Sequence, residues 1–385
     1  MSNTTNKSIR DLRKSFKKKN LSLYLGAGVS IANSLPSWEK LVLALYFAKI
    51  SEQEMEGWRP FSNYLFAIAE WHLANSTEPL EITARKLHTY YDTENGHEGG
   101  IFMEDLYRIL YGSMLDGYGE PHQDINKRFL RSKNRTLDAV AKLCESKRGG
   151  IRSVITYNYD NLLEISLGKH PYQTVYSATS LENDKLPVYH VHGYVPFDKN
   201  TPGSTFDDIV FTEDQYHLVA RDPYNWSNLV QLQSMTNSVG LMIGLSLSDR
   251  NMRRLLDAVR NAPVNSISYA LLQVPDEDPP EDRVLDEIHA KAISYLDKFK
   301  KSGIKSEQNE SSGVLFSRSG IKSARSAMPG RKGPRYQREI SGIIGQVKKL
   351  NQKQQQNVLE QLGITPIWFN KFPDIPVILG KILQG

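Results

Sequence analysis

Short, continuous apolar runs that alternate with helical stretches are the feature that most constrains the fold of this chain. Six runs are predicted strands: 21–25, 151–156, 187–192, 209–211, 241–245 and 268–273. Stretches of helical character separate the later runs: 161–167, 212–220, 225–237 and 251–261. Continuous apolar strands that alternate with helices are typical of a parallel sheet covered by helices on both faces. We therefore expect an α/β fold.

Other parts of the chain depart from this alternation. Between residues 51 and 149, apolar residues recur at spacings of three and four, which predicts a mainly helical insertion, broken near 92–100. Ser, Gly and basic residues dominate 301–335, as they do in flexible linkers. Pro366 favours an edge position for a last strand at 364–369. The predicted organisation is a basic N-terminal segment, 1–20; a core, 21–50 and 150–280; the helical insertion, 51–149; a helical excursion, 281–362, that contains the flexible linker, 301–335; and a closing strand and helix of the core, 363–385.

Composition excludes several classes of protein. The chain has 385 residues, 39% apolar and 24% charged, which is enough for a large core in one or two domains. No run approaches the roughly 18 apolar residues of a membrane span, and residues 1–20 lack the apolar region of a secretory signal. Cys144 is the single cysteine, which excludes a disulfide framework and a Cys-rich zinc site. We expect no membrane association, no metal and a cytoplasmic location.

The net charge of +5 is unevenly distributed along the chain. Residues 1–20 carry a net charge of +6 and residues 300–339 carry +7, so the remainder carries −8. Basic segments of this kind bind nucleic acid or an acidic partner protein, and the alternative is a solvated helix start and a mobile loop. Neither segment interleaves aromatic residues with its charges, as single-strand-binding surfaces do.

A glycine-rich turn, Gly26-Ala-Gly28-Val-Ser30, follows the first predicted strand. Glycines in such a turn let the backbone approach a diphosphate, and N–H groups at the start of a helix favour its negative charge. The motif departs from the dehydrogenase pattern G-x-G-x-x-G, because Ile31 occupies the place after Ser30 and no acidic ribose-binding strand end follows. A nucleotide site and an ordinary strand–helix turn both fit these residues.

Thr156-Tyr-Asn158-Tyr-Asp160 follows the second predicted strand, at the end where ligands of parallel sheets bind. Asn158 can hydrogen-bond a ribose hydroxyl or position a water molecule. Asp160 can contribute to the same site or cap the next helix.

His190-Val-His192-Gly193 lies at the end of the third predicted strand. Two histidines at this spacing share one face of a strand, and an imidazole with a pKa near 6.5 suits a general base. We assign a structural role to His190 and the role of base to His192. No third residue completes a metal site.

Gly244-Leu-Ser246-Leu-Ser248-Asp249 begins at the end of the fifth predicted strand and is a second turn that suits a nucleotide. We expect Asp249 to cap the helix that comes next.

In this order the four motifs resemble the sirtuin family, whose G-A-G-x-S, T-x-N-x-D, H-G and G-x-S patterns they match over about residues 22–250. The stretches 244–256 and 363–379 most resemble the bacterial antiviral-defence branch of that family. The resemblance implies a Rossmann-like core with NAD as substrate. It also implies that Gly26, Ala27, Gly28 and Ser30 surround the diphosphate, Asn158 holds the nicotinamide ribose and a water, Asp160 contacts the nicotinamide side, His192 is the base, and Gly244 and Ser246 line the ribose and adenine side.

One departure from the family concerns the reaction. Typical deacylase sirtuins carry a four-cysteine zinc module, which a chain with one cysteine cannot form. Water is then the favoured acceptor, which predicts an NAD+ glycohydrolase that depletes NAD in antiphage defence. The alternatives are a nucleic-acid-acting effector, such as a nuclease, with an NAD- or ADP-ribose-binding core, and a protein deacylase.

Several properties follow from the resemblance and from composition alone. The resemblance implies a homo-oligomer and a HerA-type ring ATPase as partner. The basic segments make nucleic acid a further candidate partner. Residues 90–100 and 172–186 are candidate loops that close over NAD.

Overall fold

The computed structural model describes residues 3–54, 79–94, 100–115, 125–261, 267–275 and 334–384. The chain divides into two compact units, residues 1–273 with 358–385 and residues 274–357. The described part of the second unit belongs mainly to α14 (Pro334–Gln361). The sheet and every predicted site residue belong to the first unit.

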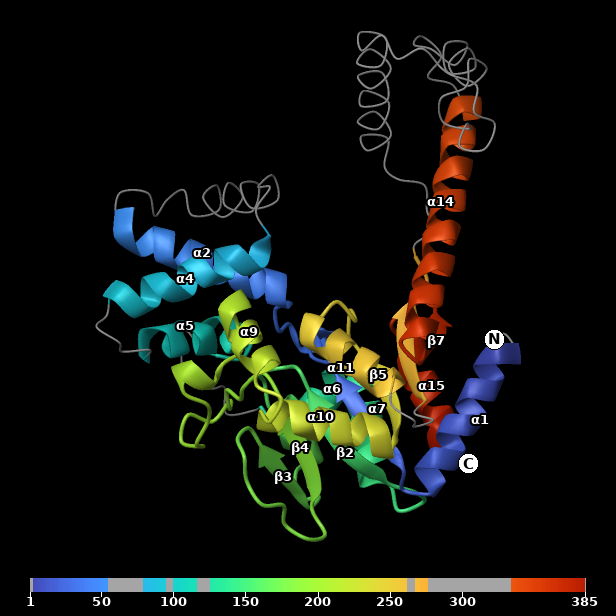
Figure 1. Ribbon diagram of the computed structural model, residues 1–385, viewed down its shortest axis with the longest axis horizontal. Coiled ribbons are helices and arrows are strands. Elements are labelled where there is room, and N and C mark those ends of the chain that lie inside the picture. Colours follow the sequence, from blue (N-terminus) through green and yellow to red (C-terminus); the bar gives the residue numbers. More distant parts are fainter. Residues whose placement is uncertain are drawn as a thin grey trace. The chain divides into compact units, whose positions relative to one another are not determined.

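In the described residues, seven parallel strands form one sheet in the order β3-β4-β2-β1-β5-β6-β7 (Figure 1). The strands are β1 Leu21–Leu25, β2 Ile151–Thr156, β3 Tyr172–Val175, β4 Leu186–His190, β5 Val239–Ile243, β6 Ser268–Gln273 and β7 Ile364–Phe369. The central strand β1 pairs with β2 and β5, and its last residue, Leu25, lies opposite Thr156 and Ile243. The predicted parallel α/β sheet is confirmed, and so is the edge position of the strand that contains Pro366.

Two strand predictions are wrong. Residues 209–211 form no strand: Ile209 and Phe211 are buried in the core from a loop, so their apolar character reflects packing without strand pairing. The edge strand β3 lies instead within 172–186, which we expected to be a loop. Three of its four residues are only half-buried, because an edge strand has one neighbour, and its apolar signal is therefore weak.

Helices cover both faces of the sheet, as predicted (Figure 1). Alternate residues of β1 enter different cores, with Leu23 and Leu25 on one face and Tyr24 on the other. The first face packs against α1 Asn3–Lys17, α7 Arg135–Glu145, α8 Leu162–Leu167 and α15 Asp374–Leu383. The second face packs against α10 Trp226–Asn237, α11 Arg250–Arg260 and the last turn of α14.

The basic N-terminal segment is a docked helix. Ile9, Leu12 and Phe16 of α1 are buried in the core. The Arg13 guanidinium donates two hydrogen bonds, of 2.6 and 3.1 Å, to the carbonyl of Lys381 near the end of α15. An apolar stripe therefore fixes α1 against the molecule and turns its lysines outward.

The described parts of 51–149 are helical, and their elements are the end of α2 (Trp38–Glu54), α4 Leu80–Glu94, α5 Gly100–Tyr111, α6 Lys127–Lys133 and α7. Leu87 of α4 and Leu106 of α5 join the same core as β1. Tyr90 and Tyr91 lie within α4, so this part of the predicted 90–100 loop is helix. Residues 95–99 of the predicted break lie outside the described residues, as do the predictions for 281–333.

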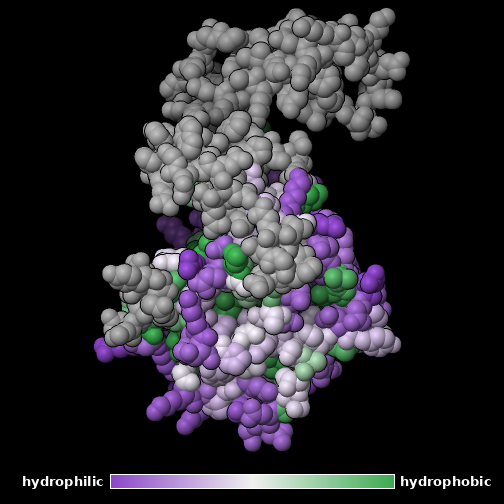
Figure 2. All heavy atoms as spheres, turned by 90° about the vertical axis from the view of Figure 1, so that its left-hand side faces the viewer, coloured by the Kyte–Doolittle hydropathy of each residue, from purple (hydrophilic) through white to green (hydrophobic). Residues whose placement is uncertain are grey.

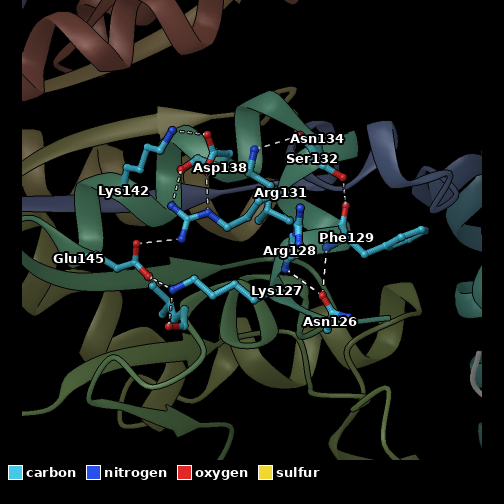
Figure 3. Close-up of polar contacts among 12 residues, drawn as sticks. Asn126, Lys127, Arg128, Phe129, Arg131, Ser132, Asn134, Asp138, Lys142 and Glu145 are labelled. Atoms are coloured by element: carbon cyan, nitrogen blue, oxygen red, sulfur yellow. Dashed lines mark hydrogen bonds and ion pairs between the residues drawn. The ribbon is translucent and has the colours of Figure 1, made fainter. Parts of the chain in front are cut away.

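A cluster of ion pairs joins α6 to α7 (Figure 3). The Arg131 guanidinium donates to Asp138 at 2.6 Å and to Glu145 at 2.9 Å. Lys142 donates to Asp138 at 2.6 Å, and Lys127 donates to Glu145. These shared carboxylates hold the two helices together.

Asn134, between α6 and α7, connects this helix pair to the turn after β1. Its side chain is fully buried, and its Oδ1 accepts from the N–H of Leu137 at 2.9 Å, which caps α7. Its Nδ2 donates to the Val29 carbonyl at 2.6 Å and to Asn33 Oδ1 at 2.7 Å. One buried amide therefore positions the backbone of the glycine-rich turn.

None of the described helices is both long and apolar enough to cross a membrane. Figure 2 shows one face of the molecule, on which hydrophilic side chains predominate among the described residues and hydrophobic ones lie scattered between them.

We expect Asn134→Ala to lower the free energy of unfolding by about 3 kcal/mol, because the cap of α7 is lost and the Val29 carbonyl is left buried without its donor. Asn126→Ala is the matched control, since Asn126 caps α6 from an exposed position and its loss costs about 1 kcal/mol. Urea denaturation measures both values. Equal losses in the two variants would contradict the anchoring role of Asn134.

Candidate functional site

The predicted site residues follow the carboxyl ends of four neighbouring strands. In chain order they are Gly26, Ala27, Gly28 and Ser30 after β1, Asn158 and Asp160 after β2, His192 after β4, and Gly244 and Ser246 after β5. The strands β4, β2, β1 and β5 are adjacent in the sheet. Because ligands of parallel α/β sheets bind outside this edge, the structure brings the four motifs to one candidate site.

Close backbone contact between two turns requires three of the glycines. A Cβ on Gly26 would lie 2.5 Å from the Gly244 oxygen, and one on Gly28 would lie 2.7 Å from the Gly244 Cα. Gly244 has a φ of +69°, which residues with a Cβ rarely adopt. The Gly26 N–H donates to Ile243 O and the Gly28 N–H to Gly244 O, both at 3.0 Å. The glycines therefore join the turns after β1 and β5.

The glycine-rich turn does not lead directly into an α-helix. The short 3-10 helices Ala27–Val29 and Ile31–Asn33 come next, and α2 begins at Trp38. The N–H groups of Gly28 and Ser30 donate to protein carbonyls. We predicted that N–H groups at the start of a helix would bind a diphosphate. The N–H groups of Gly28 and Ser30 are not available for this role.

Three polar side chains from two strand ends form a hydrogen-bonded network. Ser30 Oγ donates to Asp160 Oδ2 at 2.9 Å. Asn158 Nδ2 donates to Ser30 Oγ and to the Gly26 carbonyl, both at 3.2 Å. Asp160 Oδ1 accepts from the Leu162 N–H at 3.1 Å, so the carboxylate also supports the start of α8. The network fixes the orientation of the half-buried Asn158 amide.

Asp160 is the group of this network that titrates near neutral pH. Burial raises its pKa to about 6, although hydrogen bonds from Leu162 and Ser30 oppose the shift. Its charge is therefore sensitive to conditions close to those in a cell.

The two histidines have different surroundings. The strand β4 ends at His190, and His192 lies in the following turn, so the prediction that both share one strand face is wrong. His190 is fully buried; its Nδ1 donates to the Asn158 carbonyl at 3.1 Å, and its Nε2 lies 2.7 Å from Glu164 Oε1. These contacts agree with a structural role for His190, which supports the backbone at Asn158.

His192 lies among aromatic rings and one carboxylate. Its ring packs edge-on against Tyr157 and Tyr216, with centroids 5.0 and 5.3 Å away. Its Nε2 lies 3.5 Å from Asp249 Oδ2. Burial lowers the pKa of His192 below its usual value, and the Asp249 charge opposes this shift. Burial therefore favours the neutral imidazole, which has a ring nitrogen free of a proton.

Asp249, Tyr157 and Tyr216 are site residues that the sequence did not assign. Asp249 Oδ1 caps α11 by accepting from Met252 N at 2.6 Å, as predicted, but Oδ2 faces His192. A position after a strand end is the signal that could have identified Asp249 and Tyr157. Tyr216 lies on α9 (Glu213–Arg221), far in sequence from any strand end, and no sequence signal marks it.

Ser246, an expected contributor, and Gly193, the last residue of its motif, stand apart from this arrangement. Ser246 is exposed, and its hydroxyl lies 2.6 Å from that of Ser248. Gly193 has a φ of +110° and lies against Ile209, so its role in the structure is to turn the backbone after His192. Among the described residues, no group of three His, Cys, Asp or Glu side chains is placed to hold a metal ion.

We expect Asp249→Asn to lower the pKa of His192 further, because the variant removes the charge that favours the imidazolium. Asn is as good a helix cap as Asp, so α11 should keep its stability, whereas Asp249→Ala should lose about 1 kcal/mol from the missing cap. NMR titration of His192 measures the pKa. An unchanged pKa in Asp249→Asn would contradict electrostatic contact between the two side chains.

Asp160→Asn tests the raised pKa of the network carboxyl. In the folded protein Asp160 binds a proton up to about pH 6, whereas its ordinary pKa is 3.8, so its ionisation lowers stability as the pH rises from about 4 to 6. Relative to the natural chain, the variant should gain up to about 3 kcal/mol between pH 4 and pH 7. Urea denaturation across this range measures the gain. A constant difference between the two proteins would show that the carboxyl titrates normally.

Comparison with known proteins finds one family model and several relatives that parts of this chain resemble. Residues 152–296 match the family model of the SIR2-like domain. Defense-associated sirtuin 2 from Bacillus subtilis is 23% identical over 299 residues, which cover 77% of this chain and 25% of that protein. The NAD(+) hydrolase ThsA from Enterococcus faecium is 24% identical over 263 residues, which cover 66% of this chain and 42% of that protein.

The chain thus spans less than half the length of either curated relative. A solved structure of a Sir2 enzyme is 14% identical and covers 70% of this chain and 86% of that one, with a TM-score of 0.33. The fold class rests on the parallel sheet itself. The match over 152–296 includes the three later motifs and agrees with their resemblance to the sirtuin family, whereas the glycine-rich turn at 26–30 lies outside the matched residues.

Proposed function

We propose that this chain is an NAD+ glycohydrolase, which cleaves the bond between nicotinamide and ribose and releases nicotinamide and ADP-ribose. One observation carries the proposal: Asn158, Ser30 and Asp160 form a hydrogen-bonded network at one strand end, and His192, with a lowered pKa, follows the adjacent strand. The SIR2-like domain and the name of the ThsA relative support NAD as the substrate.

In this proposal, Asn158 positions the ribose and His192 accepts a proton. The Asn158 amide is held by Ser30 and Gly26, so its remaining polar atom is oriented for a ribose hydroxyl or a water molecule. The glycosidic C–N bond breaks, its electron pair stays with nicotinamide, and the water oxygen bonds to the ribose carbon. The proton of that water passes to the neutral imidazole of His192.

The turns after β1 and β5 supply the remainder of the site. We assign Gly26, Ala27, Gly28 and Ser30 to the surface around the diphosphate, without hydrogen bonds from the N–H groups of Gly28 and Ser30. We assign Asp160 to the nicotinamide side, and Gly244 and Ser246 to the ribose and adenine side. Because Gly26 and Gly28 contact Gly244 directly, the two turns act as one surface. A substitution at any of these glycines is therefore expected to displace both halves.

We also propose that the reaction serves antiviral defence by depleting NAD. The relative from Bacillus subtilis is named for a role in defence, which supports this use. Such an activity needs control, since an enzyme that was always active would deplete its own host. The expected homo-oligomer and the HerA-type ring ATPase are candidate means of control, and both stay predictions.

Asn158→Ala and His192→Ala should each reduce nicotinamide release from NAD at least a hundredfold, because one loses the positioning amide and the other the base. His217→Ala is the matched control: His217 lies on α9 with 68% of its side chain exposed, and its removal should leave turnover unchanged. Chromatographic detection of nicotinamide gives the rates, and thermal melting confirms folding. Full activity in both site variants would refute the assignment.

A further inference from the structure

Exposed cationic side chains gather at the amino-terminal edge of the sheet, on the side away from the candidate site. They come from the end of α1 and the turn that follows it, the turn between α7 and β2, and β2 itself. We call this group the basic edge; its members are Lys17, Lys18, Lys19, Lys147, Arg148 and Arg152.

Backbone contacts bring the two turns together. The Gly150 N–H donates to the Phe16 carbonyl at 3.0 Å, and a Cβ on Gly150 would lie 3.1 Å from Lys19 Cγ. The Arg152 guanidinium donates to the carbonyl of Asn237, the last residue of α10, at 3.1 Å. Since Phe16 is buried in the core, the basic edge is a fixed surface of the folded unit.

The charge of the basic edge is not neutralised by its own helices. Each carboxylate on the described parts of α1 and α7 pairs with another cation: Asp11 with Lys14, Asp138 with Arg131 and Lys142, and Glu145 with Arg131 and Lys127. These pairs leave the six side chains of the basic edge as a concentrated positive surface.

We propose that the basic edge binds the phosphate backbone of a nucleic-acid duplex. Lys and Arg side chains that face a phosphate array release condensed counterions and so bind without regard to sequence. Protein interfaces are depleted in Lys and need an apolar centre, whereas 17–20 and 147–152 contain no exposed large hydrophobic side chain. Single-strand-binding surfaces need aromatic residues for stacking, and the six members of the basic edge are all Lys or Arg.

The parallel sheet separates this surface from the candidate site. The seven described strands run in one direction, so the basic edge lies at their amino ends and Asn158 and His192 lie at their carboxyl ends. A duplex bound at the amino edge leaves the site edge open. Duplex binding and nicotinamide release can therefore be measured independently on the same chain.

Fluorescence anisotropy of the full chain with a labelled DNA duplex of about 30 base pairs, over a series of KCl concentrations, tests the proposal. The test variant is Lys18→Glu with Lys147→Glu and Arg148→Glu. The control variant reverses three exposed cations elsewhere, Lys40→Glu with Arg221→Glu and Lys371→Glu, and so has the same net charge. Thermal melting establishes that both variants fold.

We expect the natural chain to bind the duplex with an affinity that falls steeply with salt. The test variant should bind at least tenfold more weakly, with a shallower slope against log salt by about 2 to 3, and the control should bind within about twofold of the natural chain. The same titration with a labelled RNA duplex shows which of the two duplexes, DNA or RNA, the chain binds more tightly. Equal weakening in both variants, absence of binding at low salt, or tighter binding to poly-glutamate than to the duplex would each overturn the proposal.

Discussion

Parallel pairing of β1 with β2 on one side and β5 on the other is the constraint on which the rest of the structure depends. It brings the turns after three strands to one edge, so residues far apart in sequence become neighbours. The backbone of Gly26 and Gly28 then touches Gly244 so closely that no Cβ fits between them. Backbone contact between these turns therefore forms a rigid scaffold, and the side chains of the candidate site project from it.

Buried polar side chains fix the turns after β1 and β2 from inside the protein. Asn134 bonds the turn after β1 from the helix layer, and His190 bonds the carbonyl of Asn158 from the adjacent strand. Each such contact satisfies a backbone group that would otherwise be buried without a partner. The residues that position the site are thus as polar as the residues assigned to chemistry, which is why composition alone does not separate them.

The sequence predicted much of the fold because its central strands are buried on both faces and so appear as continuous apolar runs. It failed at the margins of the sheet: β3 is an edge strand with a weak apolar pattern, and the apolar run at 209–211 is a buried loop. It also missed the neighbours of His192, because Tyr216 comes from a helix whose packing against the strand ends cannot be deduced from spacing. Asp249 was recognised as a cap, yet its second oxygen faces the histidine.

What the sequence determined by itself is the set of strand ends and the polar residues that follow them, because burial and turn chemistry are local properties. Only the tertiary structure decided which of those ends are adjacent, which histidine is buried among structural partners, and how lysines from two distant turns form one basic edge. Strand order and helix packing depend on contacts between segments far apart in the chain. Such contacts leave no periodic signal in the segments that make them.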